Sequence, residues 1–236
     1  MKLLGVLNKL ASGELSQTAI GGTGGIQPAH YLQMINHVNL GLMDIYKRFD
    51  LKKGIAIIQQ YDHIQTYKLH PDFAETNTES LELYRYIMDS KEEPFLDDVI
   101  SIERVFNEYG VECPLNDDMD YASLHTPTQT SIQIPLPEAE NAIMVEYRAS
   151  HPEIPDITTE EAMGAYELEL PHAYLEPLMA YVASRVFAPI IDPQSPINES
   201  KDYLIKYELA CQRITELAIP NIANNTKSHV RRNGWV

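Results

Sequence analysis

Carboxylates and histidines are the side chains of this sequence whose chemistry could support catalysis or metal binding. The acidic residues form three clusters: Asp97-Asp98, Asp117-Asp118-Met119-Asp120 and Glu160-Glu161. The second cluster is the nearest to a calcium-binding loop, but it lacks the central glycine and the distant glutamate that complete the coordination. We therefore expect a solvated loop at residues 117–120 and predict no metal site.

The eight histidines, which include His30, His37, His63 and His125, follow no recognisable ligand spacing. The sequence has no HExxH pair, no zinc-type Cys/His arrangement and no G-x-S-x-G nucleophile elbow. The glycine-rich run at residues 18–25 lacks the Gly-Lys-Ser/Thr of a phosphate-binding loop. The sequence therefore predicts no catalytic residue, no cofactor and no enzymatic activity.

Acidic residues dominate the charge of the chain, which has a formal net charge of −16. Residues 72–120 carry 3 Lys and Arg against 15 Asp and Glu, a net charge of −12. Binding to nucleic-acid phosphates needs a basic surface, so this composition excludes condensation onto nucleic acid. An acidic wall could still face a DNA duplex and let it slide by repulsion. The alternative is that the acids only keep the protein soluble.

Compartment and class follow from other features of the 236 residues. No apolar run approaches the ~20 residues that cross a bilayer, so no membrane association is expected. Asn8 and Lys9 interrupt the apolar N-terminus, which does not match a secretion signal. Cys113 and Cys211 form no CxxC pair, which favours a reducing compartment. We expect a soluble product of one or two domains, located in the cytoplasm when it is made.

An amphipathic helix is predicted at residues 28–50, because apolar residues recur there at steps of three and four. Its predicted interface residues are Tyr31, Ile35, Val38, Leu42 and Phe49. Gly41 interrupts this helix and predicts close packing against another helix. The pattern then changes to short strands, with a hairpin turn predicted at residues 107–110. Two more helical stripes follow, one of Leu175, Leu178, Val182 and Val186, the other of Tyr203, Leu204, Tyr207, Cys211, Ile214 and Leu217.

These patterns predict an α+β fold in which an antiparallel helical bundle carries an inserted β-rich domain. Residues 28–50 and 171–222 are assigned to the bundle, and residues 51–170 to the insertion. Residues 1–27, a short helix followed by the glycine-rich strap, are predicted to be a flexible arm that reaches a neighbouring subunit. An ordinary frayed terminus is the alternative.

The C-terminal tail, residues 223–236, is basic and contains no acid. It carries Lys227, Arg231 and Arg232, and Trp235 is the sole tryptophan of the chain. Trp and Arg are enriched at the hot spots of interfaces. We therefore predict a docking tail, with a disordered tail as the alternative.

Several segments resemble the head-to-tail adaptor proteins of tailed bacteriophages, also called head-completion or connector proteins. In the first long helix the similar residues are Asn36, Asn39 to Leu42, Tyr46 to Phe49, Leu51 and Lys52. The β-rich segment is similar at Ile100-x-Ile102, Val105-x-Asn107-x-x-Gly110, Pro114 to Asp117, Thr126-Pro127 and Ile143-x-Val145-x-Tyr147-x-Ala149, and the next helix at Leu170-Pro171 and Leu175 to Arg185. The order of these motifs along residues 28–190 matches the family.

The resemblance implies a structural virion protein of the neck or tail, assembled in the host cytoplasm. It implies a homo-oligomeric ring, usually twelvefold, clamped between the portal protein and the next tail component, the hub or nozzle. Double-stranded DNA would pass through the ring without specific binding, with residues 72–120 facing the channel or the lower tail. Lys227, Arg231, Arg232 and Trp235 would dock on the portal or on an adjacent subunit.

Two other classes of protein stay open at this point. One is another ring of the phage tail, such as a nozzle or completion ring, which would have different partners. The other is a small-molecule enzyme with a pocket lined by Asp117, Asp118 or His125. Such an enzyme would be a monomer or a small oligomer.

Overall fold

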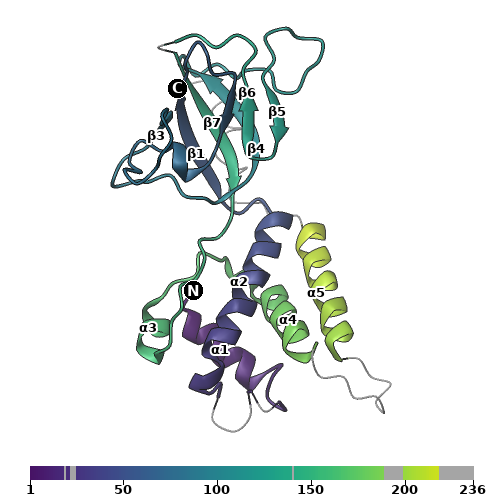
Figure 1. The fold of residues 1–236 in the computed structure, drawn as a ribbon. Coiled ribbons are helices and arrows are strands. Elements are labelled where there is room, and N and C mark those ends of the chain that lie inside the picture. The colour runs from purple at the N-terminus through teal and green to yellow at the C-terminus, as the bar shows by residue number, and fades with distance from the viewer. Residues whose placement is uncertain (19, 22–24, 140, 189–198, 218–236) are drawn as a thin grey trace, which may run out of the picture. The chain divides into compact units, whose positions relative to one another are not determined.

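The computed structural model describes residues 1–18, 20–21, 25–139, 141–188 and 199–217 (Figure 1). Five α-helices lie in these ranges: α1 (Leu3–Ser12), α2 (Tyr31–Arg48), α3 (Glu160–Ala165), α4 (Leu175–Phe187) and α5 (Glu199–Glu216). The strands are β1 (Lys53–Gln59), β2 (Thr66–Lys68), β3 (Ile87–Met88), β4 (Val99–Asn107), β5 (His125–Thr128), β6 (Ser131–Gln133) and β7 (Ala142–Ala149). Three short 3-10 helices occupy Pro28–His30, Pro71–Phe73 and His172–Tyr174.

The described residues divide into two compact units. The helical unit consists of Met1–Phe49 and the described residues from His151 onward, and the sheet unit spans Asp50–Ser150. The stretch 151–170, assigned to the β-rich domain from the sequence, lies in the helical unit. There the Asn39 amide of α2 exchanges two hydrogen bonds with the backbone of Ile154.

The prediction of an antiparallel helical bundle with an inserted β-rich domain is wrong. The fold is α+β, with two antiparallel sheets beside the five helices, and it is rich in sheet instead of being organised as a bundle. The helical stripes were identified correctly as helices, but a stripe shows only that one face is buried. It does not show how many helices share that core.

Helix α4 lies between α2 and α5 in the helical unit (Figure 1). It is buried on nearly all sides, with buried residues Pro177, Leu178, Ala180, Tyr181, Val182, Ala183, Ser184 and Val186. The predicted interface residues of α2 are all buried: Tyr31, Ile35, Val38, Leu42 and Phe49. Helix α1, expected in a flexible arm, packs on α3 and α4 and buries Leu3, Val6, Leu7 and Leu10.

Gly41 lets α2 approach α4 closely, as the sequence predicts. A Cβ atom at this position would lie 2.8 Å from Leu178 Cδ1 and 3.1 Å from Tyr181 Cδ1. Both neighbours are buried in α4, so they have little room to move. The absence of a side chain therefore sets the distance between the two helices.

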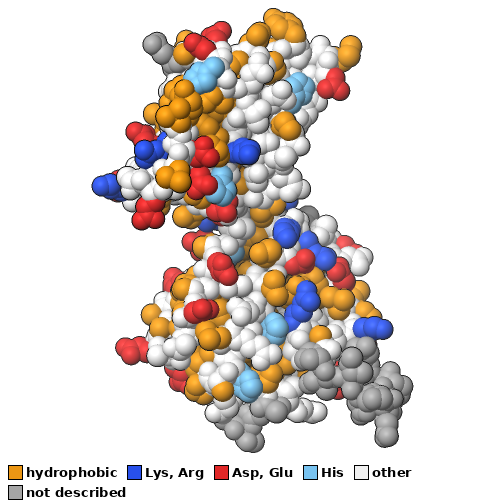
Figure 2. Space-filling view, viewed as in Figure 1, with side chains coloured by type: hydrophobic (Ala, Val, Ile, Leu, Met, Phe, Trp, Pro, Cys, Tyr) orange, Lys and Arg blue, Asp and Glu red, His pale blue; other side chains and the backbone are white. Residues whose placement is uncertain are grey.

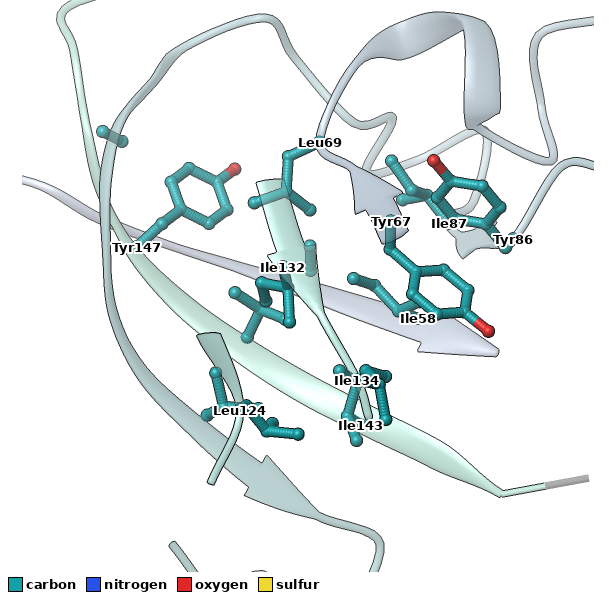
Figure 3. Packing of buried hydrophobic residues seen from close by; sticks show 14 residues of the cluster. Ile58, Tyr67, Leu69, Tyr86, Ile87, Leu124, Ile132, Ile134, Ile143 and Tyr147 are labelled. Carbon is teal, nitrogen blue, oxygen red and sulfur yellow. The ribbon is translucent and has the colours of Figure 1, made fainter. Parts of the chain in front are cut away.

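The sheet unit contains a four-stranded antiparallel sheet in the order β3-β1-β7-β4 and a three-stranded sheet in the order β2-β6-β5. Buried residues from both sheets form one core, which includes Ile58, Tyr67, Ile132 and Tyr147 (Figure 3). Gly54 pairs with Tyr147 across β1 and β7, and the Tyr147 ring occupies the space where a Cβ would be. The predicted turn at residues 107–110 is confirmed, because Gly110 N donates to Asn107 O at 2.9 Å.

We predict that Gly41→Ala lowers the free energy of unfolding by about 1–2 kcal/mol, because overpacking of the α2–α4 contact outweighs the gain in helix propensity. Urea denaturation measures this change. Gly5 of α1 is the matched control, since a Cβ there meets nothing within 4 Å. Gly5→Ala should raise stability by about 0.5–1 kcal/mol. A stabilising Gly41→Ala would contradict the close approach.

Candidate interaction surfaces

The acidic clusters found in the sequence serve the local structure. Asp98 is buried, lies 3.4 Å from Lys52 Nζ and accepts a hydrogen bond from the Tyr147 hydroxyl at 3.2 Å. Asp117 accepts a 3.0 Å hydrogen bond from a backbone N–H of its own loop, as expected of a solvated turn. Glu160, in the first turn of α3, accepts a 2.8 Å hydrogen bond from the Tyr31 hydroxyl of α2.

Metal ligands do not converge in the described residues, where no three His, Cys, Asp or Glu side chains could hold an ion. A pocket of about 410 Å³ in the helical unit lies beside Gln17, Tyr203 and Lys206, and one of about 320 Å³ in the sheet unit lies beside Lys68 and Phe73. Asp117, Asp118 and His125 line neither of these two pockets.

His37 of α2 is the one predicted histidine whose environment is unusual. Both ring nitrogens are buried and have no hydrogen-bond partner in the protein. Burial, and then the positive charge of Arg185, lowers the pKa of His37 below its ordinary value. A neutral imidazole of this kind acts as a core side chain of the helical unit.

An ion network centred on Lys53 crosses the four-stranded sheet. Lys53 Nζ lies 2.9 Å from Glu146, 3.0 Å from Glu103 and 3.8 Å from Asp50. Arg148 donates to Glu103 Oε1 from Nε at 3.1 Å and from Nη2 at 3.0 Å. Burial favours the neutral lysine, but the hydrogen bonds to Glu146 and Glu103 raise the pKa of Lys53 above its ordinary value. The charges on this part of the sheet are therefore satisfied within the unit.

Beside this network, an apolar row crosses the outer face of the sheet. Ile57 pairs with Met88 of β3 and with Met144 of β7, and Met144 pairs with Phe106 of β4. Ile57 is 43% exposed and Met88 is 48% exposed, while Ile55, two residues along β1, is 61% exposed. We call these five residues the apolar row. An apolar face left open on a sheet is typical of an interaction surface.

Helix α2 also has a second, exposed apolar face. Leu32, Leu40 and Met43 are 41%, 43% and 46% exposed, and they share this face with Asn36 and Lys47. Steps of three and four place all five on one side of the helix. We call this surface the α2 outer face. It lies opposite the side of α2 that packs on α4.

Helix α5 carries a comparable surface, the α5 outer face, formed by Leu204, Ile205 and Leu209. These residues are 46%, 57% and 48% exposed. Leu204 and Leu217 were predicted in the buried stripe of this helix, and that is wrong for both, since Leu217 is 73% exposed. The packed side of α5 instead consists of Tyr207, Ala210, Cys211 and Ile214. Figure 2 shows hydrophobic side chains reaching the surface of both units.

The acidic segment 72–120 lies on the surface of the sheet unit. All of its residues are described, and Asp98 is the one acid among them that is buried. The tail residues predicted to dock, Lys227, Arg231, Arg232 and Trp235, lie outside the described part of the chain.

Comparison with known proteins adds no assignment. No family model matches the chain, and no match is found among curated proteins. None of the helices in the described ranges is both long enough and apolar enough to span a membrane.

We predict that Lys53→Met lowers the free energy of unfolding by about 3 kcal/mol at neutral pH, because Glu146 and Asp50 lose the cation that compensates their burial. Burial and Glu103 already raise the pKa of Asp50. A buried acid with a raised pKa favours the folded state below its unfolded pKa and loses that contribution as pH rises. The deficit should therefore shrink between pH 7 and about pH 4, which denaturation at several pH values measures.

The matched control is Arg213→Met, since the Arg213–Glu176 pair is long, at 3.8 Å, and both side chains are mostly exposed. That substitution should change stability by less than about 0.5 kcal/mol. Equal effects of the two substitutions at neutral pH would contradict a special role for Lys53.

Proposed function

We propose that this chain is a structural virion protein, the head-to-tail adaptor that forms a ring under the portal of a tailed bacteriophage. The resemblance of the ordered motifs in residues 28–190 supports this family. The ring would connect the capsid to the next tail component in the virion neck, and DNA would leave through it. A twelvefold ring, assembled in the host cytoplasm, is the copy number that the resemblance implies.

The observation that carries the proposal is that one helical unit exposes two different apolar faces. A symmetric dimer needs a single self-complementary patch, whereas a head-to-tail contact needs two complementary ones and closes into a ring when the rotation allows. The α2 outer face and the α5 outer face provide two such patches on the helices that flank α4. We assign the contact between neighbouring copies to these two faces.

The acidic surface of residues 72–120 supports the proposed passage of DNA. Its carboxylates repel phosphates, so a duplex nearby gains no affinity that would hold it in place. Channel walls of this charge suit a polymer that must move past the protein.

We predict that Leu40→Lys and Leu209→Lys each abolish ring assembly on the portal, because each places a charge in one side of the contact. The two positions are 43% and 48% exposed, so neither substitution disturbs the core. Mass photometry of the chain with its portal measures assembly. Leu81→Lys is the control, because Leu81 is fully exposed in the sheet unit. It should leave assembly unchanged.

Mixing the two variants sharpens the test. The α5 outer face of Leu40→Lys and the α2 outer face of Leu209→Lys are both intact, so the mixture can form one contact per pair. It should yield heterodimers detectable by native mass spectrometry or cross-linking, but no ring. Rings from either variant alone would contradict the assigned contact, and failure of the wild-type chain to bind any portal would contradict the adaptor proposal.

We further predict that deleting residues 227–236 abolishes attachment to the portal while leaving the fold intact. The reason is that this segment holds the basic residues and the sole tryptophan assigned to docking. Infectivity of particles assembled with the shortened chain measures the effect. Infectious particles at the normal yield would refute the role of the tail.

A further inference from the structure

The apolar row on the sheet unit is not used by the proposed ring contact. It joins all four strands of the sheet in register, from Met88 through Ile57 and Met144 to Phe106. Half-exposed Ile57 and Met88 lie at its centre and at one end, and no described segment of the chain covers them. Methionine side chains adapt to the shape of a partner and make favourable sulfur–aromatic contacts.

The charges of the sheet unit limit what can bind this row. Residues 50–150 carry 7 Lys and Arg against 20 Asp and Glu, a net charge of −13. The cations nearest to the row are already engaged, since Arg104 pairs with Glu112 at 2.5 Å and Lys53 with Glu146 at 2.9 Å. An occupant should therefore combine an apolar, preferably aromatic, anchor with positive charge and no acid.

One segment of this chain has that composition. Residues 218–236 contain Lys227, Arg231 and Arg232, no acidic residue, and the sole tryptophan, Trp235. They follow the last described residue, Leu217, and their 19 residues can reach roughly 60 Å when extended. That length exceeds the breadth of a compact unit of about 100 residues, which has a radius of gyration near 13 Å.

We propose that the apolar row is the docking site of the C-terminal segment 218–236. The Trp235 ring packs against the side chains of Ile57, Met88 and Met144, and the three cations lie over the acidic surroundings of the row. The sheet unit that receives the segment belongs to the same copy or to an adjacent copy. This assignment does not depend on the adaptor function, because it concerns a contact made by the chain alone.

Trp235 reports on its own docking, since no other indole contributes to the fluorescence of the chain. In the full-length protein its emission should be blue-shifted, and less accessible to iodide and acrylamide, than in the urea-unfolded chain. Ile57→Lys removes the centre of the row and repels the cations, so it should move the emission to that of a hydrated indole. Met88→Gln, a milder change, should give a smaller shift in the same direction.

Leu40→Lys is the matched control, because Leu40 and Ile57 are both 43% exposed. It should leave the emission unchanged, although the ring contact assigned above should be lost. High salt, and replacement of Lys227, Arg231 and Arg232 by Gln, should each weaken docking. A synthetic peptide of residues 218–236 should bind the chain truncated after residue 217, and binding to its Ile57→Lys version should be at least tenfold weaker. Circular dichroism verifies that each variant is folded.

Three results would overturn the proposal. Emission of a hydrated indole in the intact wild-type chain would show that the segment does not dock. A blue-shifted emission that Ile57→Lys leaves unchanged would place the segment elsewhere, for example on the α2 or α5 outer face. A dependence of the shift on Leu40→Lys instead of Ile57→Lys would do the same. Failure of the chain to bind a portal would affect none of these readings.

Discussion

Burial of α4 on nearly all sides is the constraint on which the helical unit depends. A helix that is apolar around its whole circumference needs neighbours on more than one side, and α2 and α5 provide them (Figure 1). Each flanking helix then spends one face on α4 and leaves the other open. The two exposed apolar faces, and with them the proposed ring contact, follow from this arrangement. Close approach at Gly41 keeps α2 seated on α4.

The sheet unit solves a different problem, which is to bury charge beside an apolar surface. Lys53 holds Glu146 and Glu103, and Arg148 holds Glu103 from the neighbouring strand, so the buried carboxylates are compensated internally. The network occupies one part of the sheet and leaves the apolar row uncovered in another. The row and the acidic surroundings together define what chemistry the unit can accept.

Much of the local structure was predictable from the sequence. The stripe Tyr31–Phe49 predicted the buried face of α2, Gly41 predicted a close helix contact, and the turn at residues 107–110 was placed correctly. The surfaces were missed although their signals were present. Leu32, Leu40 and Met43 form a second apolar stripe on α2, and residues 55–58 are apolar on both faces of β1. Each pattern also fits a residue that is buried, so exposure could not be deduced from it.

The sequence by itself determined the periods of the helices and strands, the uneven acidic charge and the composition of the C-terminal segment. These depend on neighbours along the chain, where spacing and side-chain type are sufficient. The tertiary structure alone decided that the helices do not form a bundle, that α1 packs within the helical unit, and that Leu204 and Leu217 face solvent. Those outcomes depend on how many elements pack against each face, which segments distant in sequence settle together by filling a shared core.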